Sequence, residues 1–269
     1  MSLKDLIGKN VLDLILEFPK INWTYYHGGA GALGATIDSL TFVTYESHAP
    51  VSDKVDLFGP RLQISQGIKR KDLAFIGKDK ERTIGLTDLV KLGKPKPTKR
   101  KYKYLPYMGE YYAGNAYGHI PMIDFDTEDR FDSMSDRQLL QMLRKQTAEV
   151  TQMRRGVFLK SSRSRNYHFF GVGYILSEND FTTFCGLCLS MKHTTPAGKI
   201  MNLVDERGVG HALTPMNLYM ASEWDEFDTS PVENSHYAMG MRFYTLRVSP
   251  KPGQRTYPKI VDVMDYRRR

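Results

Sequence analysis

Apolar side chains recur at helical spacing in three stretches of this chain. Residues 6–18 place an apolar side chain every three or four positions, which predicts an N-terminal helix. Residues 135–150 repeat that spacing behind Ser135 and Gln138, a pair in the register of a capping box. A further helix is predicted over residues 177–191. The chain should therefore contain helices near its start and in its second half.

Runs of β-branched and aromatic residues between turn residues predict strands. These runs cover residues 41–45, 61–64, 120–126, 157–160, 167–176, 242–248 and 259–264. Strands and helices therefore mix along the chain, and no internal repeat divides it. If the chain has a boundary, we expect it near residue 100, between an N-terminal α/β portion (1–100) and residues 101–269 of one compact unit.

The composition is that of an ordinary globular protein. The chain has 269 residues, of which 41% are hydrophobic and 25% are charged, enough for a sizeable apolar core. No apolar run approaches the roughly 18 residues of a membrane-spanning helix. Lys9, Asp13 and Glu17 interrupt the first apolar stretch, unlike in a secretory signal. Because two cysteines cannot form a disulfide framework, we expect a cytoplasmic protein with no membrane partner.

The chain is basic, with a formal net charge of +8, which suits a polyanionic partner but does not require one. The bias is greatest in residues 91–103, where seven of thirteen residues are Lys or Arg and two are proline. Prolines exclude a regular helix or a central strand there, and six tyrosines follow between residues 102 and 117. This pattern is typical of a surface for a phosphate backbone and stacked bases, although it also fits a solvated loop beside packed tyrosines. The candidates for nucleic-acid binding are Lys99, Arg100, Lys101 and Lys103.

An acidic pair ends one of the predicted strands. Strand periodicity places Asp124 and Asp126 on one face, and Ile123 and Phe125 on the other, toward the core. Two neighbouring carboxylates repel each other unless a cation or a proton lies between them. Hard divalent ions such as Mg²⁺ bind through one or two carboxylates plus substrate phosphates. The pair therefore predicts a metal site, while the alternative is a strand end that has reached solvent.

A polar loop between two predicted strands gathers hydroxyl, guanidinium, ammonium and imidazole groups. Such groups can hold a triphosphate, because Arg pairs with phosphate in a bidentate way and Ser donates hydrogen bonds to it. The alternative is a polar hairpin turn with a histidine packed in the sheet. The candidates for nucleotide binding are Lys160, Ser161, Ser162, Arg163, Arg165 and His168.

The order of these elements resembles the catalytic core of archaeo-eukaryotic primases and primase-polymerases over residues 118–264. That family has a hydrophobic strand ending in Asp-x-Asp, a helix, a strand hairpin with a Ser-x-His-type motif, and then a third acidic motif. Here Asp124 and Asp126 match the first motif. The second motif ends in Asn166, Tyr167 and His168, which departs from Ser-x-His.

The resemblance assigns the third acid to Asp205, with Glu233 and His236 as alternatives, and it adds Arg247 as a residue that neutralises charge on phosphates or template. It implies an α+β fold, with a mixed or antiparallel sheet and flanking helices. Its catalytic half would resemble an RNA-recognition motif, and the N-terminal α/β portion would be an extension of that half.

The resemblance also implies a mechanism. Asp124, Asp126 and Asp205 would hold one or two Mg²⁺ or Mn²⁺ ions, which lower the barrier for a 3′-hydroxyl attacking an α-phosphate. The Ser/Arg loop, His168 and Arg247 would hold the triphosphate. The implied partners are nucleoside triphosphates and a DNA or RNA template, and the implied activity is that of a metal-dependent nucleotidyltransferase.

Two other functions stay open. The first is a non-catalytic nucleic-acid-binding replication or regulatory protein on the same fold, which the Asn166 departure and the open choice of third acid favour. The second is a glycosyltransferase that uses Asp-x-Asp and Mn²⁺, although one diphosphate does not require so many cations. Cys185 and Cys188 lie at helical spacing and are interpreted as core residues. The glycine pattern at residues 29–34 lacks the flanking strand and helix of a dinucleotide site.

Overall fold

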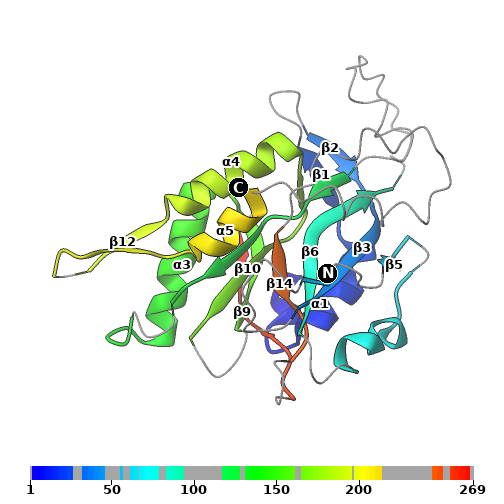
Figure 1. Cartoon of the computed structure of the whole chain (residues 1–269), viewed down its shortest axis with the longest axis horizontal. Coiled ribbons are helices and arrows are strands. Elements are labelled where there is room, and N and C mark those ends of the chain that lie inside the picture. Colours follow the sequence, from blue (N-terminus) through cyan, green and yellow to red (C-terminus); the bar gives the residue numbers. More distant parts are fainter. Residues whose placement is uncertain are drawn as a thin grey trace.

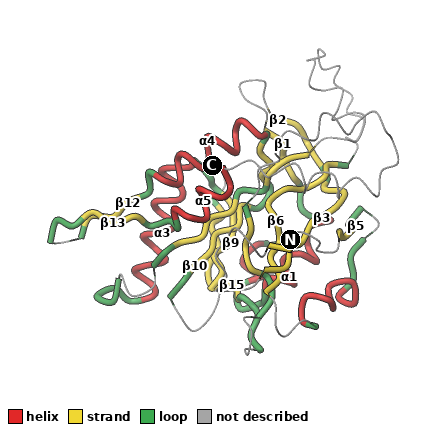
Figure 2. Tube along the Cα trace, in the orientation of Figure 1, coloured by secondary structure: helices red, strands yellow, loops and turns green. Residues whose placement is uncertain are grey.

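Two packed sheets make up the centre of the protein. The structure is a computed structural model that describes residues 2–26, 32–45, 55–56, 61–65, 67–78, 83–93, 117–127, 131–160, 165–195, 197–213, 244–250 and 255–266. Figure 1 shows the sheets between a group of helices on one side and the N-terminal helix below, and Figure 2 shows a hairpin that projects from the helical side. This is the mixed α+β architecture that the sequence predicts.

The larger sheet has nine strands and combines residues from both sides of position 100. Its path runs β2-β1-β11-β7-β6-β3-β4, with β14 added to β6 and β5 added to β3. The strands are β1 (Trp23–Tyr26), β2 (Ala32–Ala35), β3 (Ile37–Tyr45), β4 (Val55–Asp56), β5 (Arg61–Gln63), β6 (Thr83–Leu92), β7 (Tyr117–His119), β11 (Tyr174–Leu176) and β14 (Thr245–Arg247). The N-terminal portion and the later portion therefore share a continuous hydrogen-bonded sheet.

The smaller sheet is antiparallel and carries the acidic strand at its edge. Its order is β15-β9-β10-β8. The strands are β8 (Met122–Phe125), β9 (Arg155–Lys160), β10 (Tyr167–Gly171) and β15 (Lys259–Asp265). A separate hairpin joins β12 (Lys192–Thr194) to β13 (Ile200–Asn202).

Helices cover the sheets and close the core. Among the described residues, the α-helices are α1 (Val11–Glu17), α3 (Asp136–Thr151), α4 (Glu178–Leu189) and α5 (Glu206–Leu213), and the 3-10 helices are Leu3–Leu6, Phe18–Lys20 and Arg70–Gly77. Ser135 and Gln138 form the predicted capping box of α3. Cys185 and Cys188 are buried on α4, as the sequence predicts. A single cluster of buried apolar side chains runs through both sheets.

The edge strand β8 follows the predicted alternation. Ile123 and Phe125 are buried, whereas Asp124 is partly exposed. The Phe125 ring stacks on Phe158 of β9, with 6.2 Å between centroids. Burial of large aromatic side chains on one face therefore orients the acidic face of β8 outward.

Two predicted elements are divided in the structure. The predicted helix over residues 6–18 is interrupted at Gly8, whose φ of 84° favours glycine, and α1 begins only after a capping box between Asn10 and Asp13. The predicted strand over residues 167–176 is two strands in different sheets. Gly173, with φ of 87°, turns the chain from the smaller sheet into the larger one.

The longest strand was missed by the sequence patterns. Nearly all of β6 is buried, so it shows no alternation, and Thr, Asp and Lys interrupt its apolar residues. Lys91 and Leu92 end this strand, which corrects the prediction that residues 91–103 form a loop throughout. The other basic candidates, Lys99, Arg100, Lys101 and Lys103, lie outside the described residues, as do residues 29–31 of the glycine pattern.

A buried ionic cluster links the larger sheet to α4. His119 Nδ1 lies 3.0 Å from Asp88 Oδ2, and His119 Nε2 lies 2.8 Å from Glu178 Oε2. The imidazole also stacks on Phe181, with 4.1 Å between ring centroids. Asp88 and His119 are fully shielded from water, whereas the Glu178 side chain is half exposed. The two carboxylates therefore favour a charged imidazolium inside the core.

The buried imidazolium predicts a stability that falls as the pH rises. Burial alone would lower the pKa of His119, but Asp88 and Glu178 outweigh it and raise that pKa to about 9. The ordinary value is 6.5, so the folded state binds this proton more tightly than the unfolded state does. The stabilisation is complete below that ordinary pKa and is lost as the pH rises through the folded pKa. Urea unfolding across this window should show a decline of about 3 kcal/mol in the free energy of unfolding.

Two variants isolate this effect. His119→Gln removes the titrating group and retains a hydrogen-bonding side chain, so its free energy of unfolding should depend much less on pH in this window. Glu178→Gln removes a charge from the exposed end of the cluster and so lowers the folded-state pKa of His119, which means that the decline should be smaller and should end at lower pH. An unchanged decline in both variants would show that other groups cause it.

Candidate functional site

The chain folds back onto the acidic strand immediately after the β12–β13 hairpin. Asp205 N–H donates to the Asp124 carbonyl oxygen at 2.9 Å, and Asp126 N–H donates to the Leu203 carbonyl oxygen at 3.0 Å. Phe125 and Val204 form the antiparallel bridge between these two bonds. Residues directly opposite in an antiparallel pair project to the same face. Asp205 therefore lies beside Asp124, on the face that also carries Asp126.

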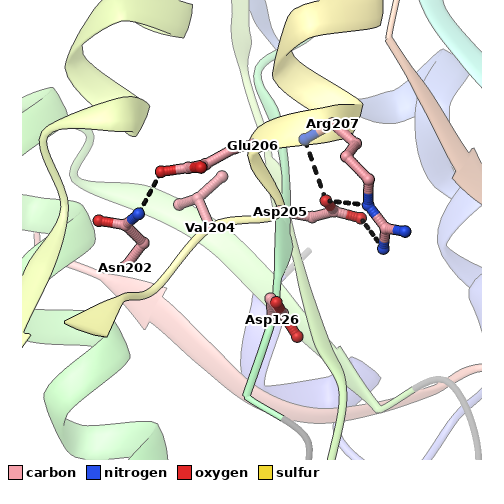
Figure 3. A pocket seen from close by; sticks show the side chains of 6 residues that line it. All are labelled: Asp126, Asn202, Val204, Asp205, Glu206 and Arg207. Carbon is pink, nitrogen blue, oxygen red and sulfur yellow. Dashed lines mark hydrogen bonds and ion pairs between the residues drawn. The ribbon is translucent and has the colours of Figure 1, made fainter.

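A surface hollow of about 450 Å³ opens beside these acids. Figure 3 shows its lining side chains, which are Asp126, Asn202, Val204, Asp205, Glu206 and Arg207. The Asn202 amide donates a hydrogen bond to the Glu206 carboxylate at one end of the hollow. Its volume is within the range of small-molecule sites. A nucleotide-sized ligand could therefore occupy it next to the carboxylates.

Arg207 neutralises Asp205. Its Nε lies 3.2 Å from Asp205 Oδ1, and its backbone N–H donates to the same oxygen at 3.1 Å. This hydrogen bonding raises the pKa of Arg207, with smaller contributions from Asp126 and Asp124. The Arg207 side chain is 86% exposed, and ion pairs with so exposed a partner contribute little stability. The guanidinium is therefore an exchangeable partner of Asp205.

His168 is a fixed partner of Asp124. Antiparallel pairing of β10 with β8 places the two residues opposite each other, and His168 Nδ1 lies 3.0 Å from Asp124 Oδ1. The contact is at ion-pair distance but lacks hydrogen-bond alignment, so neither ring nitrogen of this buried histidine has a hydrogen-bond partner among the described residues. Buried polar atoms of this kind usually have a partner. The ring is thus available to an additional polar group at the site.

The Tyr244 hydroxyl supports the acidic strand β8 through a hydrogen bond to its backbone. Its hydroxyl oxygen accepts a hydrogen bond from Asp124 N–H at 3.1 Å, and its own backbone N–H donates to Asp88 Oδ1 at 2.6 Å. Burial raises the pKa of Tyr244 well above its usual value, and the nearby Asp124 adds to the shift, so the hydroxyl stays neutral. A Cβ at Gly208 would lie 2.8 Å from that hydroxyl, so glycine allows α5 to pack closely there. Tyr244 therefore connects the site to the buried Asp88–His119 pair.

The basic candidates for nucleotide binding are mostly engaged in structural contacts. Arg165 donates to the carbonyl oxygens of Phe131 and Met134 at 2.8 and 2.6 Å, and its Nε lies 3.1 Å from Asp136. Lys160 pairs with the same Asp136 at 2.8 Å. Both side chains thus hold the start of α3, which does not favour the predicted role in phosphate binding.

The remaining candidates are placed elsewhere or lie outside the described residues. Arg247 is buried on β14, opposite Gly85 of the larger sheet, so a different sheet positions it from the one that carries Asp124. Ser161, Ser162 and Arg163 lie outside the described residues, and so do the alternative third acids, Glu233 and His236.

The donor chemistry of the site suits a hard divalent cation, but its present geometry does not. Asp124, Asp126 and Asp205 offer the carboxylate oxygens that Mg²⁺ and Mn²⁺ prefer. Within the described part of the chain, however, no three His, Cys, Asp or Glu side chains converge closely enough to hold a metal ion. Asp205 instead faces Arg207. A cation could therefore be held only after the Asp205 side chain turns away from the guanidinium.

Comparison with known families identifies the segment that contains these acids. Residues 110–219 match the model of the AEP-like family, described as "Archaeo-eukaryotic primase 1D-like". This segment is similar to archaeo-eukaryotic primases. The resemblance predicted from the sequence is confirmed for these residues. The primase-like segment includes β8, β10, the hairpin and α5, and hence Asp124, Asp126, His168 and Asp205.

Other comparisons add no relative. Neither a search of curated proteins nor a search of solved structures found a match. In the described ranges, no helix has the length and apolar character needed to cross a membrane.

Sequence reasoning missed several residues that shape the site. Arg207 could have been found from its position two residues after Asp205, because the start of a helix commonly brings such neighbours together. Asn202 is separated from Asp126 by too many residues for any local pattern to join them. Tyr244 offers no local signal, since only the packing of β14 against the site brings its hydroxyl to Asp124.

Loss of the Tyr244 hydroxyl should destabilise the acidic strand. Tyr244→Phe leaves the partly buried Asp124 N–H without its acceptor, which should lower the free energy of unfolding by about 1–2 kcal/mol. Urea unfolding at neutral pH would measure this loss.

Tyr174→Phe is a matched control. The Tyr174 hydroxyl also accepts a backbone N–H, that of Arg154 at 3.1 Å, but at an exposed position. Water can replace it there, so the loss should be below about 0.5 kcal/mol. Equal losses in the two variants would argue against a supporting role for Tyr244.

Proposed function

We propose that this protein is a metal-dependent nucleotidyltransferase that resembles primase-polymerases and adds nucleotides on a nucleic-acid template. The observation that carries the proposal is the backbone pairing of Asp205 with Asp124 inside the primase-like segment. That pairing puts Asp205 on the face of the paired strands that carries Asp124 and Asp126, and Asp126 and Asp205 line a hollow of nucleotide size. Three acids beside a small-molecule hollow are the arrangement expected for phosphoryl transfer.

Asp124, Asp126 and Asp205 would hold Mg²⁺ or Mn²⁺ in the active protein. The bound ion would supply charge stabilisation for the attacking and leaving oxygens of the transfer. Holding it requires Asp205 to exchange its contact with Arg207, and the exposure of Arg207 makes this exchange inexpensive.

The chain's own residues would then position the reactants. His168 would keep Asp124 in its orientation from the neighbouring strand β10. The released Arg207 guanidinium would pair with phosphate oxygens of a nucleoside triphosphate in the hollow. A 3′-hydroxyl would attack the α-phosphorus, so that a new P–O bond forms, pyrophosphate leaves and the hydroxyl proton passes to water.

A non-catalytic nucleic-acid-binding role is the second candidate. The observation that favours it is the absence of a ready three-carboxylate group among the described residues. If Asp205 does not leave Arg207, the site would bind metal poorly and would serve only to hold nucleic acid. The two candidates differ in whether binding is followed by nucleotide addition.

Nucleotide addition should depend on all three acids. Wild-type protein incubated with a primed DNA or RNA template, mixed nucleotides and Mg²⁺ or Mn²⁺ should extend the primer. Asp124→Asn, Asp126→Asn and Asp205→Asn should each reduce the extension rate by about 100-fold or more, because each removes a charge that balances the cation. Denaturing gels with an end-labelled primer would measure the rates.

Glu149→Gln is the matched control for charge removal. The Glu149 side chain is exposed on α3 and lies 3.9 Å from the Lys145 ammonium, so loss of its charge should leave extension unchanged. Wild-type protein that binds the template but extends no primer under any of these conditions would establish the non-catalytic alternative. Unaltered extension by Asp205→Asn alone would remove Asp205 from the site and leave the other two acids in it.

Removal of the Arg207 guanidinium should strengthen metal binding. Arg207→Gln removes the cation that competes for Asp205, so the protein without nucleotide should bind Mn²⁺ several-fold more tightly. Titration followed by the electron paramagnetic resonance of free Mn²⁺ would measure this. Arg137→Gln, an exposed change on α3, should leave the affinity unchanged. Weaker Mn²⁺ binding by Arg207→Gln would contradict the exchange described above.

A further inference from the structure

The β12–β13 hairpin projects from the helical side of the molecule (Figures 1 and 2). Within the described part of the chain, its two strands pair only with each other, in the register Lys192↔Asn202, His193↔Met201 and Thr194↔Ile200. Two-stranded ribbons are marginally stable alone. The hairpin is therefore an extension held at its base, where Leu203 N–H donates to the Met191 carbonyl oxygen at 3.1 Å.

The hairpin has an inward face and an outward face. On the inward face, the His193 ring lies 5.6 Å from the ring of Phe131, and Met201 packs against the core. The outward face carries the alternate residues, which include Thr194 and Ile200. Ile200 is 64% exposed, more than any other large apolar side chain among the described residues. Ile200 therefore does not contribute to the core, and an exposed apolar side chain of this kind can mark a binding surface.

The hairpin carries positive charge without acidic residues. Lys192 and Lys199 are exposed, and residues 191–203 contain no Asp or Glu. Neither lysine has an acidic neighbour within this segment to neutralise it. An exposed apolar side chain near two exposed lysines complements a sugar–phosphate chain, which presents phosphates alternating with less polar sugars and bases.

The outward face leads directly into the candidate site. Asn202 belongs to the outward row of β13 and also lines the hollow that contains Asp126 and Asp205. The chain from Lys199 to Asp205 is extended, so at about 3.3 Å per residue it spans about 20 Å. That length corresponds to about six nucleotides of one strand of a duplex.

We propose that the outward face of the β12–β13 hairpin, together with its exposed tip, binds the phosphate backbone of the nucleic acid engaged at the acidic site. Lys192 on the outward face and Lys199 at the tip contact phosphates, and Ile200 packs against a sugar or a base. This inference rests on the proposed function for the identity of the ligand, but it concerns binding and does not require catalysis. The hairpin thus extends the site along the nucleic acid by about six nucleotides.

The test is binding of a fluorescein-labelled primer–template to the full chain, followed by anisotropy over a series of salt concentrations. Lys192→Ala/Lys199→Ala should weaken binding at low salt by at least about tenfold and should reduce the slope of log K against log salt by nearly 2, because two phosphate contacts are lost. Ile200→Ser should weaken binding without changing the slope. Circular dichroism should show unchanged folding, since all three side chains are exposed.

The matched control is Lys71→Ala/Lys78→Ala. These two exposed lysines lie at the Arg70–Gly77 helix, away from the hairpin in Figure 1. Their loss changes the net charge by the same amount, so binding should change little and the salt slope should stay near that of the wild type. Equal effects of the two double variants would overturn the proposal, because they would reflect net charge alone.

The outcomes separate this inference from the proposed function. If the wild type extends primers and the hairpin variants bind and extend like it, the hairpin proposal fails and the proposed function stands. If no protein extends primers but the hairpin variants lose binding, the proposed function fails and the hairpin proposal stands. Light scattering adds another arm: if Ile200→Ser breaks a dimer without altering nucleic-acid affinity, the face contacts a second copy of the chain, and the proposal is overturned.

Discussion

The pairing of residues 203–205 with the end of β8 controls how the candidate site is built. Two backbone hydrogen bonds fix the register between segments that are far apart in the chain. Leu203 and Val204 are buried, whereas Asp205 is partly exposed. A slip of one residue would turn the aspartate toward the core and expose an apolar side chain. Burial of an unpaired carboxylate is costly, so the apolar residues before Asp205 hold it in place.

The same pairing sets the direction of two neighbouring elements. The hairpin ends at Asn202, immediately before the paired segment, and α5 begins at Glu206, immediately after it. Both elements therefore contribute side chains to the hollow. Gly208 then lets the first turn of α5 approach the Tyr244 hydroxyl, which itself accepts the N–H of Asp124. The acidic strand is thus held at its edge by the paired segment and through its backbone by the Tyr244 hydroxyl.

The contacts that support Tyr244 extend into the larger sheet. Asp88 accepts the backbone N–H of Tyr244 and also contacts His119. A buried carboxylate without such partners would be strongly destabilising, so Asp88, His119 and Tyr244 must be ordered together. The position of Asp124 consequently depends on a strand from the first hundred residues. This dependence gives a physical reason why the primase-like segment is embedded in a sheet that it shares with the N-terminal portion.

The sequence predicted those features that depend on neighbouring residues. The alternation around Asp124 and the capping box of α3 are local, and both are confirmed. The division of residues 167–176 between two sheets depends on which strands each half meets, so periodicity alone could not predict it. Arg165 has the right chemistry for phosphate, but its donors reach the carbonyl oxygens of the segment before α3. Residue type indicates what a side chain can bind, whereas its actual partner depends on the fold.

The two partners of the acids differ in how easily they can be exchanged. His168 is buried on β10, directly opposite Asp124, and moving it would disturb the paired strands. Arg207 reaches Asp205 from solvent, so its removal costs little packing. A cation that arrives with a triphosphate could therefore take the place of Arg207 at Asp205, while the released guanidinium pairs with the phosphates. Each charge keeps an opposite partner throughout this exchange, which avoids the cost of leaving carboxylates together without a cation. One fixed and one exchangeable partner therefore fit the proposed binding of a metal together with its nucleotide better than the binding of a metal alone.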